Sequence, residues 1–305
     1  MLISVHAMHA TLAFPFTPVT WSSVPDSSFA LSNINAINYN QPLDLYVAVG
    51  NSGKIATSGD TQNWTQRESN FGENSVFCVA YGNNQFVAGG SSGKISTSPD
   101  GVNWTSRSSG FGATPILAVT YSPSASLWIA AGGAGKLATS VDGISWVLRT
   151  SSFGTTYING LWASNSIIVA VGYDGKLATS TNGTTWTQRT SSFGTSSIFG
   201  VTATAGGRFF ACGEAGKFAF SNNGTTWIQS FPTSTFGAST VRSVAISADG
   251  TYIAGGASGK LATSFDGITW IQRTSGFGTS TINGVYIDNN TGLAVGAAGK
   301  ITYSV

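Results

Sequence analysis

A glycine followed by a lysine recurs at a nearly constant interval through this 305-residue chain. All seven lysines of the sequence belong to these pairs, and successive lysines are 40, 42, 40, 41, 43 and 40 residues apart. They are Lys54, Lys94, Lys136, Lys176, Lys217, Lys260 and Lys300. A period of this length indicates a solenoid, an array or a propeller, and it suits a unit of four short strands.

The segments within one unit are typical of strands. In residues 260–273 and 281–305, short runs rich in Val, Ile, Thr and aromatic residues are bounded by Gly, Asn, Asp and Ser. Helical periodicity is not evident. One position of the first run always holds a small residue, which lets innermost strands crowd around an axis: Ala36, Cys78, Ala118, Gly160, Gly200, Ser243 and Gly284.

The two ends of the sequence complete one another. Seven Gly-Lys pairs occur, but only six complete turns of the form Ser-x-Asp/Asn-x-x-x-Trp. Trp21 is followed by Phe29 much as each later Trp is followed by a Phe. The N-terminus therefore supplies the outer strand of a unit whose other three strands are C-terminal, which closes a ring without exposed edges. The predicted fold class is an all-β, seven-bladed β-propeller of four-stranded blades, spanning residues 19–305.

Residues 1–18 lie outside the repeat and are mostly apolar. They lack a basic start, His6 and His9 interrupt them, and they are too short to span a bilayer. We expect an N-terminal docking arm that packs on the propeller or on a partner. No metal site is expected at the two histidines, since no cysteine or carboxylate lies near them.

The turn before each outer strand carries an acid or its amide: Asp60, Asp100, Asp142, Asn182, Asn223 and Asp266. We expect this side chain to accept backbone N–H bonds within the turn, and the following Trp to fill the space between blades. Asn replaces Asp in two units, which favours a structural over a catalytic role. The turn resembles the Asp-box, or BNR, repeat of sialidases and of many non-enzymatic propellers. The resemblance implies that these turns lie at the periphery, opposite the ligand face.

The seven lysines have two interpretations. In one, Gly forms the turn and Lys solvates the start of the next strand. In the other, seven ammonium groups form a positive collar for an anionic partner, such as an acidic protein surface or a glycan bearing carboxylate or phosphate. Arginines that recur three residues after a Trp, such as Arg67 and Arg107, are expected to stack on aromatic rings or pair between blades.

Departures from the repeat are where a ring-shaped protein can place a specific site. Arg242 stands where other units have Asn35, Phe77, Leu117, Asn159, Phe199 and Asn283. Two Gly-Lys turns carry charged or aromatic residues that the other turns lack, namely Tyr173-Asp174 and Glu214. The predicted pocket consists of Arg242, Asn159, Asn283, Tyr173, Asp174 and Glu214.

Hydrolytic chemistry finds little support in the sequence. Sialidases need an arginine triad, a Tyr–Glu pair and an acidic Asp, and the repeat does not bring such a set together. No Ser-His-Asp set, phosphate loop or metal motif is present. We therefore predict no enzymatic activity, no cofactor and no metal.

The sequence favours a binding or structural propeller. Its near-identical, Ser/Thr/Gly-rich units resemble virion proteins of tailed bacteriophages, which implies location in the virion, contacts with other virion proteins through residues 1–18, and host-surface glycan binding. The alternatives are a propeller similar to the photosystem II assembly factor, in the thylakoid lumen or periplasm, or a secreted extracellular lectin. A net charge of +2 does not indicate nucleic-acid binding. Cys78 and Cys212 occupy small apolar positions and are expected to be buried thiols.

Overall fold

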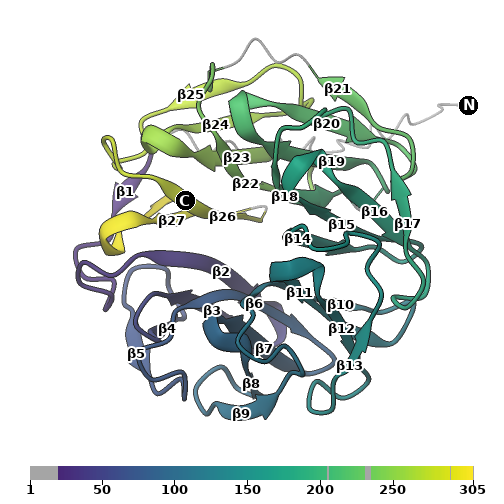
Figure 1. The fold of residues 1–305 in the computed structure, drawn as a ribbon. Helices are drawn as coiled ribbons and strands as arrows, with labels where there is room; N and C mark the ends of the chain where they lie inside the picture. Colours follow the sequence, from purple (N-terminus) through teal and green to yellow (C-terminus); the bar gives the residue numbers. More distant parts are fainter. Residues whose placement is uncertain (1–19, 205, 231–234, 289, 305) are drawn as a thin grey trace, which may run out of the picture.

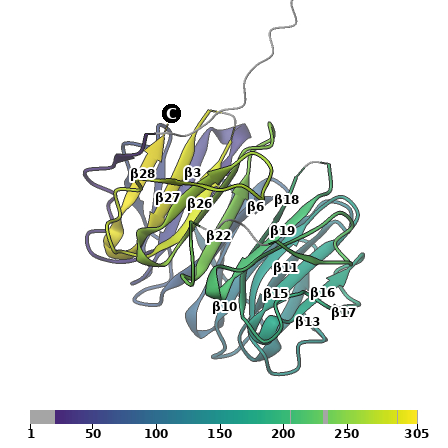
Figure 2. The same ribbon diagram turned by 90° about the horizontal axis from the view of Figure 1, so that it is seen from above.

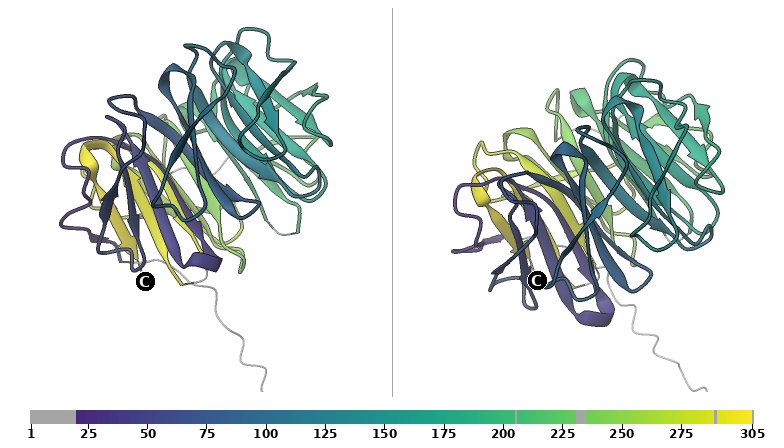
Figure 3. Two further views of the ribbon diagram at one scale, coloured as in Figure 1. Left: turned by 90° about the horizontal axis from the view of Figure 1, so that it is seen from below. Right: turned by 60° about the horizontal axis from the view of Figure 1, so that its bottom comes forward.

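The computed structural model describes residues 20–204, 206–230, 235–288 and 290–304. These residues form seven four-stranded antiparallel sheets. Figure 1 shows the sheets arranged as blades around a central axis, and the views from the side show them packed face to face (Figures 2 and 3). The predicted fold class is confirmed. We number the blades 1 to 7 along the chain and letter their strands A to D from the axis outward.

Strand A of each blade is the innermost, and A strands of neighbouring blades lie side by side around the axis. They are β2 (Ile34–Asn40), β6 (Val76–Gly82), β10 (Ile116–Ser122), β14 (Ile158–Ala163), β18 (Ile198–Ala203), β22 (Val241–Ile246) and β26 (Ile282–Ile287). The predicted small residues lie in these strands, because neighbouring A strands approach too closely for larger side chains. A Cβ on Gly200 would come 2.9 Å from Cys212 Sγ and 3.5 Å from the Ser243 Cα of the next blade.

Strand B is buried along most of its length between the neighbouring blades. The B strands are β3 (Leu45–Gly50), β7 (Gln85–Gly90), β11 (Leu127–Gly132), β15 (Ile168–Gly172), β19 (Phe209–Gly213), β23 (Tyr252–Gly256) and β27 (Gly292–Gly296). The C strands are β4 (Ile55–Ser58), β8 (Lys94–Ser98), β12 (Leu137–Ser140), β16 (Leu177–Ser180), β20 (Phe218–Ser221), β24 (Leu261–Ser264) and β28 (Ile301–Ser304).

Strand D is the short outer edge of each blade. The D strands are β5 (Thr65–Arg67), β9 (Thr105–Ser108), β13 (Val147–Arg149), β17 (Thr187–Arg189), β21 (Ile228–Ser230), β25 (Ile271–Arg273) and β1 (Ser22–Ser23). The helices of the described residues are single 3₁₀ turns: η1 (Gln41–Leu43), η2 (Ser91–Gly93), η3 (Gly133–Gly135), η4 (Tyr173–Gly175), η5 (Glu214–Gly216), η6 (Ala257–Gly259) and η7 (Ala297–Gly299).

Blade 7 closes the ring with both ends of the chain. In Figure 1 the purple β1 lies at the edge of the yellow C-terminal strands. Ser22 pairs with Tyr303 and Ser23 with Thr302, and the Val24 N–H donates to the Ile301 carbonyl at 2.9 Å. The predicted closure is therefore confirmed, and Trp21 precedes β1 as the other tryptophans precede their D strands. The docking arm predicted for residues 1–18 lies outside the described residues.

The hydrophobic core consists of layers between adjacent blades. Between blades 3 and 4, Ile129 and Leu137 pack with Ile158 and Ile168. The tryptophan after each Asp/Asn turn joins such a layer, as Trp64 of blade 1 does with Leu293 of blade 7. The expected packing of tryptophan between blades is thus present.

The C–D turns have the expected hydrogen bonds. In all six, one side-chain oxygen of the Asp or Asn accepts two backbone N–H groups, and Asp60 accepts those of Gln62 and Asn63 at 3.0 and 2.8 Å. The indole N–H of Trp64 donates back to the Thr61 carbonyl at 2.9 Å. Asp60, Asp100, Asp142, Asn182, Asn223 and Asp266 therefore stabilise turns at the periphery.

These bonds also hold the carboxylates in their charged form. Burial by itself would raise the pKa of Asp266, but hydrogen bonds from the Thr269 and Ile268 N–H groups outweigh it and lower the pKa to about 2. In contrast, burial raises the pKa of the Cys78 and Cys212 thiols to about 12. Both cysteines are free and buried, as predicted.

The recurring arginines bind within their own blades. The Nε of each donates to a strand C threonine, such as Arg67 to Thr57 Oγ1 at 2.8 Å. The prediction that these arginines stack on aromatic rings is not confirmed. Among the described residues, the cation–ring contacts involve the two arginines outside the repeat, Arg208 and Arg242.

Strand order divides the loops between two faces. The B–C turns, which contain the Gly-Lys pairs, and the D–A loops lie at one end of every blade, and we call this end the mouth face. The A–B turns and the Asp/Asn-containing C–D turns lie at the other end, the Asp-turn face. The predicted separation of the Gly-Lys turns from the Asp turns follows directly from this topology.

Replacing Trp104 by Ala should lower the free energy of unfolding by about 3–5 kcal/mol, because it removes a large side chain that is only 5% exposed. Trp146 occupies the same position in blade 3 but is half-buried, so Trp146→Ala should cost less. Urea denaturation measures both. Equal losses, or none for Trp104→Ala, would contradict the proposed packing.

Candidate functional site

Each Gly-Lys turn binds the D–A loop that enters its own blade. The lysine Nζ donates to the backbone carbonyl of the phenylalanine in that loop, and the seven distances lie between 2.7 and 3.0 Å. The acceptors are Phe29, Phe71, Phe111, Phe153, Phe193, Phe236 and Phe277, whose side chains are at most 1% exposed. The lysine therefore holds the backbone of a loop whose aromatic side chain anchors it in the core.

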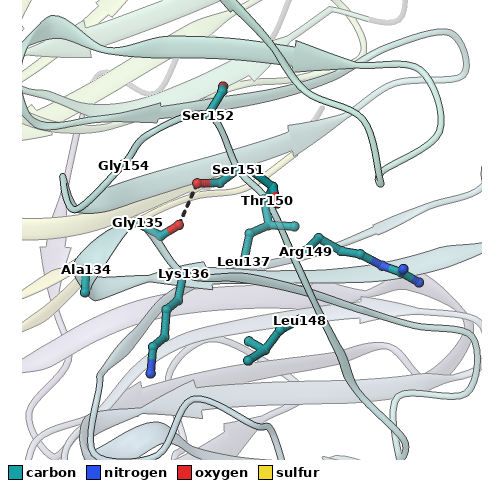
Figure 4. Close-up of a pocket in the computed structure, with 10 residues that line it drawn as sticks. All are labelled: Ala134, Gly135, Lys136, Leu137, Leu148, Arg149, Thr150, Ser151, Ser152 and Gly154. Atoms are coloured by element: carbon teal, nitrogen blue, oxygen red, sulfur yellow. Dashed lines mark hydrogen bonds between the residues drawn. The ribbon is translucent and has the colours of Figure 1, made fainter.

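The glycine of the same turn contacts the loop that leaves the blade. In blade 3, Gly135 has φ +62, and a Cβ there would lie 2.0 Å from the Gly154 carbonyl oxygen. Its own carbonyl accepts the Ser151 hydroxyl at 2.5 Å (Figure 4). Only glycine combines this left-handed conformation with so close an approach. Each B–C turn is thus fixed between two successive D–A loops.

The seven lysines make hydrogen bonds to the backbone that neither interpretation of the sequence predicted. All seven lysines are partly buried and donate to a backbone carbonyl, rather than extending freely into solvent. Lys176 and Lys217 each make a second bond, to Thr156 Oγ1 and to Ser196 Oγ, both at 2.9 Å. Their positive charges still surround the mouth face, and the anion-binding role stays a prediction.

A β-bulge interrupts every A strand near its start. The register shifts between Ile34 and Ala36 of blade 1, and the equivalent shift occurs in all seven blades. Bulges redirect a side chain out of the regular alternation. The residues within the bulges line one cavity of about 240 Å³ at the axis, which we call the axial mouth: Asn35, Phe77, Leu117, Asn159, Phe199, Arg242 and Asn283.

The three asparagines of the axial mouth link neighbouring blades. The Asn159 amide donates to the Ile198 carbonyl of the next blade at 2.9 Å. Asn283 makes the equivalent bond to Ile34 at 2.9 Å, and Asn35 bonds to Val76 at 2.8 Å. The other bulge residues of the axial mouth are Phe77, Leu117, Phe199 and Arg242. The asparagines are therefore both part of the scaffold and part of the lining.

Arg242 and the rings of Phe199 and Tyr173 belong to the lining of the axial mouth. Arg242 is exposed, and its Cζ lies 5.7 Å from the centre of the Phe199 ring. Tyr173, which also lines the cavity, has its ring centre 6.2 Å from that of Phe199 and stacks on Tyr157 at 5.4 Å. The guanidinium is held over a ring by a cation–π contact, which leaves its N–H groups available to a ligand.

The structure brings together four of the six predicted pocket residues. Arg242, Asn159, Asn283 and Tyr173 line the axial mouth. Asp174 is at the exposed tip of its turn, with φ 54, and does not line the cavity. Glu214 does not line it either, and its Oε2 accepts the Ser197 N–H at 2.8 Å.

The prediction missed four lining residues: Asn35, Phe77, Leu117 and Phe199. Repeat alignment already placed them at the position of Arg242, so equivalence in the repeat was the available signal. Because the fold is a closed ring, equivalent positions near the axis meet at one point.

Shallow depressions at the outer rim repeat between blades. The one in blade 3, of about 330 Å³, lies beneath the outgoing D–A loop and includes Lys136 and Arg149. Figure 4 shows the two side chains pointing in different directions. They do not converge on a common point, so this depression is a weaker candidate site than the axial mouth.

Within the described residues, no group of three or more His, Cys, Asp and Glu side chains is placed to hold a metal ion. None of the helices in this part of the chain has the length and apolar character needed to cross a membrane.

Comparison with known proteins identifies the fold. No family model matches the chain, and no curated protein sequence matches it. Among solved structures, YCF48 from Cyanidioschyzon merolae is similar, with a TM-score of 0.73 and 17% identity over 93% of this chain and 98% of that one. A structure described as YCF48 bound to D1 peptide has a TM-score of 0.72 and 18% identity, covering 96% and 98%.

A lyase has the same fold. Virginiamycin B lyase from Staphylococcus aureus has a TM-score of 0.80 and 10% identity, over 94% of this chain and 99% of that one. The prediction that this chain is not an enzyme is therefore wrong, because it was inferred from fold and motifs and an enzyme has the same fold. It considered hydrolase residue sets, whereas a propeller of this shape also carries lyase activity.

Replacing Lys176 by Met should reduce the free energy of unfolding by ~1–2 kcal/mol, because it removes a charged donor to Phe153 and Thr156 but keeps the aliphatic stem. Lys94→Met removes one such bond and should cost less. Thermal and urea unfolding of the two variants provide the measurement. Wild-type stability in both would show that the lysines are only solvated.

Proposed function

We propose that this chain is a binding propeller that holds an acidic peptide segment of a partner protein at the axial mouth. The observation that carries the proposal is the convergence of seven bulge residues on one cavity, with Arg242 exposed beside Phe199 and Tyr173. An arginine fork matches the geometry of a carboxylate, and aromatic and aliphatic side chains around it accept apolar parts of the same peptide.

The electrostatics of the mouth face support an acidic ligand. All seven lysines and Arg242 lie on this face, and so do the five arginines at the ends of the D strands. Five acidic residues share the face: Asp26, Glu68, Glu73, Asp174 and Glu214. The excess of positive charge raises the local concentration of anionic segments and speeds their association.

Structural similarity is consistent with a peptide ligand. One neighbour of the same fold, YCF48, is described as bound to D1 peptide. A propeller of this shape therefore has room for a peptide. The proposal for this chain rests on its own axial mouth, since the two sequences share 18% identity.

We further propose membership in the Asp-box propellers, which is supported by the six C–D turns with their shared hydrogen bonds. The structural neighbours named above include no virion protein, so the virion role, virion partners and virion location rest on sequence resemblance alone. Glycan binding is retained as an alternative outcome of the experiment below.

Screening on an array of 12-residue peptides, with free and amidated C-termini, should select acidic peptides. For the best binder, Arg242→Ala should weaken binding measured by calorimetry at least about tenfold, as expected for loss of one charged hydrogen bond. The matched control is Arg208→Ala, because Arg208 also contacts a phenylalanine ring but lies on the Asp-turn face. This control should bind like the wild type.

Two results would contradict the proposal. One is equal weakening by Arg242→Ala and Arg208→Ala. The other is binding on a parallel glycan array together with no binding to any peptide, which would favour the lectin alternative.

A further inference from the structure

A second cavity lies on the Asp-turn face, between the A–B turns of blades 6, 7 and 1. Its volume is about 480 Å³, and its lining includes Tyr39, Gln41, Ser247, Tyr286 and Asp288. We call it the tyrosine cavity. None of its lining residues belongs to the axial mouth, and the described lining contains no lysine or arginine.

Three tyrosine rings form a compact cluster at the tyrosine cavity. The ring centre of Tyr39 lies 4.5 Å from that of Tyr46 and 5.7 Å from that of Tyr286. Tyr46 and Tyr286 meet edge to face at 5.7 Å, with an interplanar angle of 82°. Tyr39 and Tyr286 are half-buried and line the opening. The faces of such rings carry partial negative charge and attract cations.

Aspartates complete this arrangement. The Tyr286 hydroxyl donates to Asp288 Oδ2 at 3.2 Å, and the Tyr39 hydroxyl donates to Asp44 Oδ1 at 2.9 Å. The other oxygen of Asp288, Oδ1, accepts the Asn290 and Thr291 N–H groups at 2.8 and 2.7 Å. Burial, followed by the charge of Asp288, raises the pKa of Tyr46 to about 12. Burial also raises the pKa of Tyr39 and of Tyr286, so the three tyrosines stay neutral.

The wider face has the same sign of charge. Seven aspartates lie in its A–B and C–D turns, and five of them belong to blades 6, 7 and 1: Asp44, Asp60, Asp249, Asp266 and Asp288. Among the described residues of this face, the one lysine or arginine is Arg208, in blade 5. It contacts the rings of Phe210 and Phe220 and donates to the Asp266 carbonyl at 3.3 Å. The tyrosine cavity thus lies in the most acidic part of the molecule.

We infer that the tyrosine cavity binds the cationic end of a lysine or arginine side chain presented by a partner protein. The aliphatic stem packs against the rings of Tyr39 and Tyr286, and the ammonium or guanidinium binds the carboxylate of Asp288. The propeller then has two sites of opposite preference on opposite faces. This inference does not depend on the peptide proposed for the axial mouth.

Titration of the intact chain with acetyl-Gly-Arg-Gly-amide and acetyl-Gly-Lys-Gly-amide tests the inference. Amide NMR shifts should change in residues 246–248 and 286–288, and the neutral acetyl-Gly-Gln-Gly-amide should leave them unchanged. Asp288→Asn should weaken binding of the cationic peptides about tenfold, as expected for loss of a charged hydrogen bond. The amide keeps an oxygen for the two N–H groups of the turn, as Asn182 does in its own turn.

The control is Glu73→Gln, which removes one negative charge from the exposed mouth face. Its affinity for the cationic peptides should equal that of the wild type. Three results would each overturn the inference. The neutral peptide could cause equal shifts, or Asp288→Asn could bind with unchanged affinity while its other amide signals match the wild type. The third is equal weakening of binding in Asp288→Asn and Glu73→Gln.

Discussion

The structure depends on the backbone contacts that each Gly-Lys turn makes with two successive D–A loops. The lysine donates to the carbonyl of the incoming loop, and the glycine, at positive φ, lies against the outgoing loop. Each loop also carries a phenylalanine that is buried in the core. Repeated seven times, this contact joins every blade to the next. The loop from blade 7 to blade 1 is held by Gly299, which accepts the Ser27 hydroxyl, and by Lys54, which donates to Phe29.

In a ring held together in this way, a few positions can vary without loss of the fold and can form a binding site. The bulge in each A strand turns one side chain toward the axis, and the ring brings the seven together. Asparagine at three of them bonds to the next blade, whereas Arg242, Phe77, Leu117 and Phe199 differ in charge and shape. Asymmetry within a symmetric scaffold thus produces the axial mouth. On the opposite face, the tyrosines and aspartates at the A–B turns of blades 7 and 1, with residues 246–248 of blade 6, produce the tyrosine cavity by the same principle.

Sequence predicted the features that follow from strand register. The blade count, the closure at Trp21, the small residues of the A strands and the hydrogen bonds of the C–D turns all depend on position within the repeat. The partners of long side chains were less predictable. Glu214 binds a loop N–H, and each lysine binds a loop carbonyl. Both bonds depend on how the D–A loop folds back onto the B–C turn, which the sequence pattern alone does not show. The exclusion of enzymes failed for another reason, since it tested known catalytic residue sets and motifs, none of which represents a lyase propeller.

Amide hydrogen exchange tests the closed ring most directly. The strand β28 pairs on one side with β27 and on the other with the N-terminal β1, as β12 pairs with β11 and β13 in blade 3. If the ring is closed as described, amides of β28 should be protected to a similar extent as those of β12, and the Val24 amide should be protected by its bond to Ile301. Rapid exchange of Val24 and β28 with a protected β12 would contradict the account, because blade 7 would then be open.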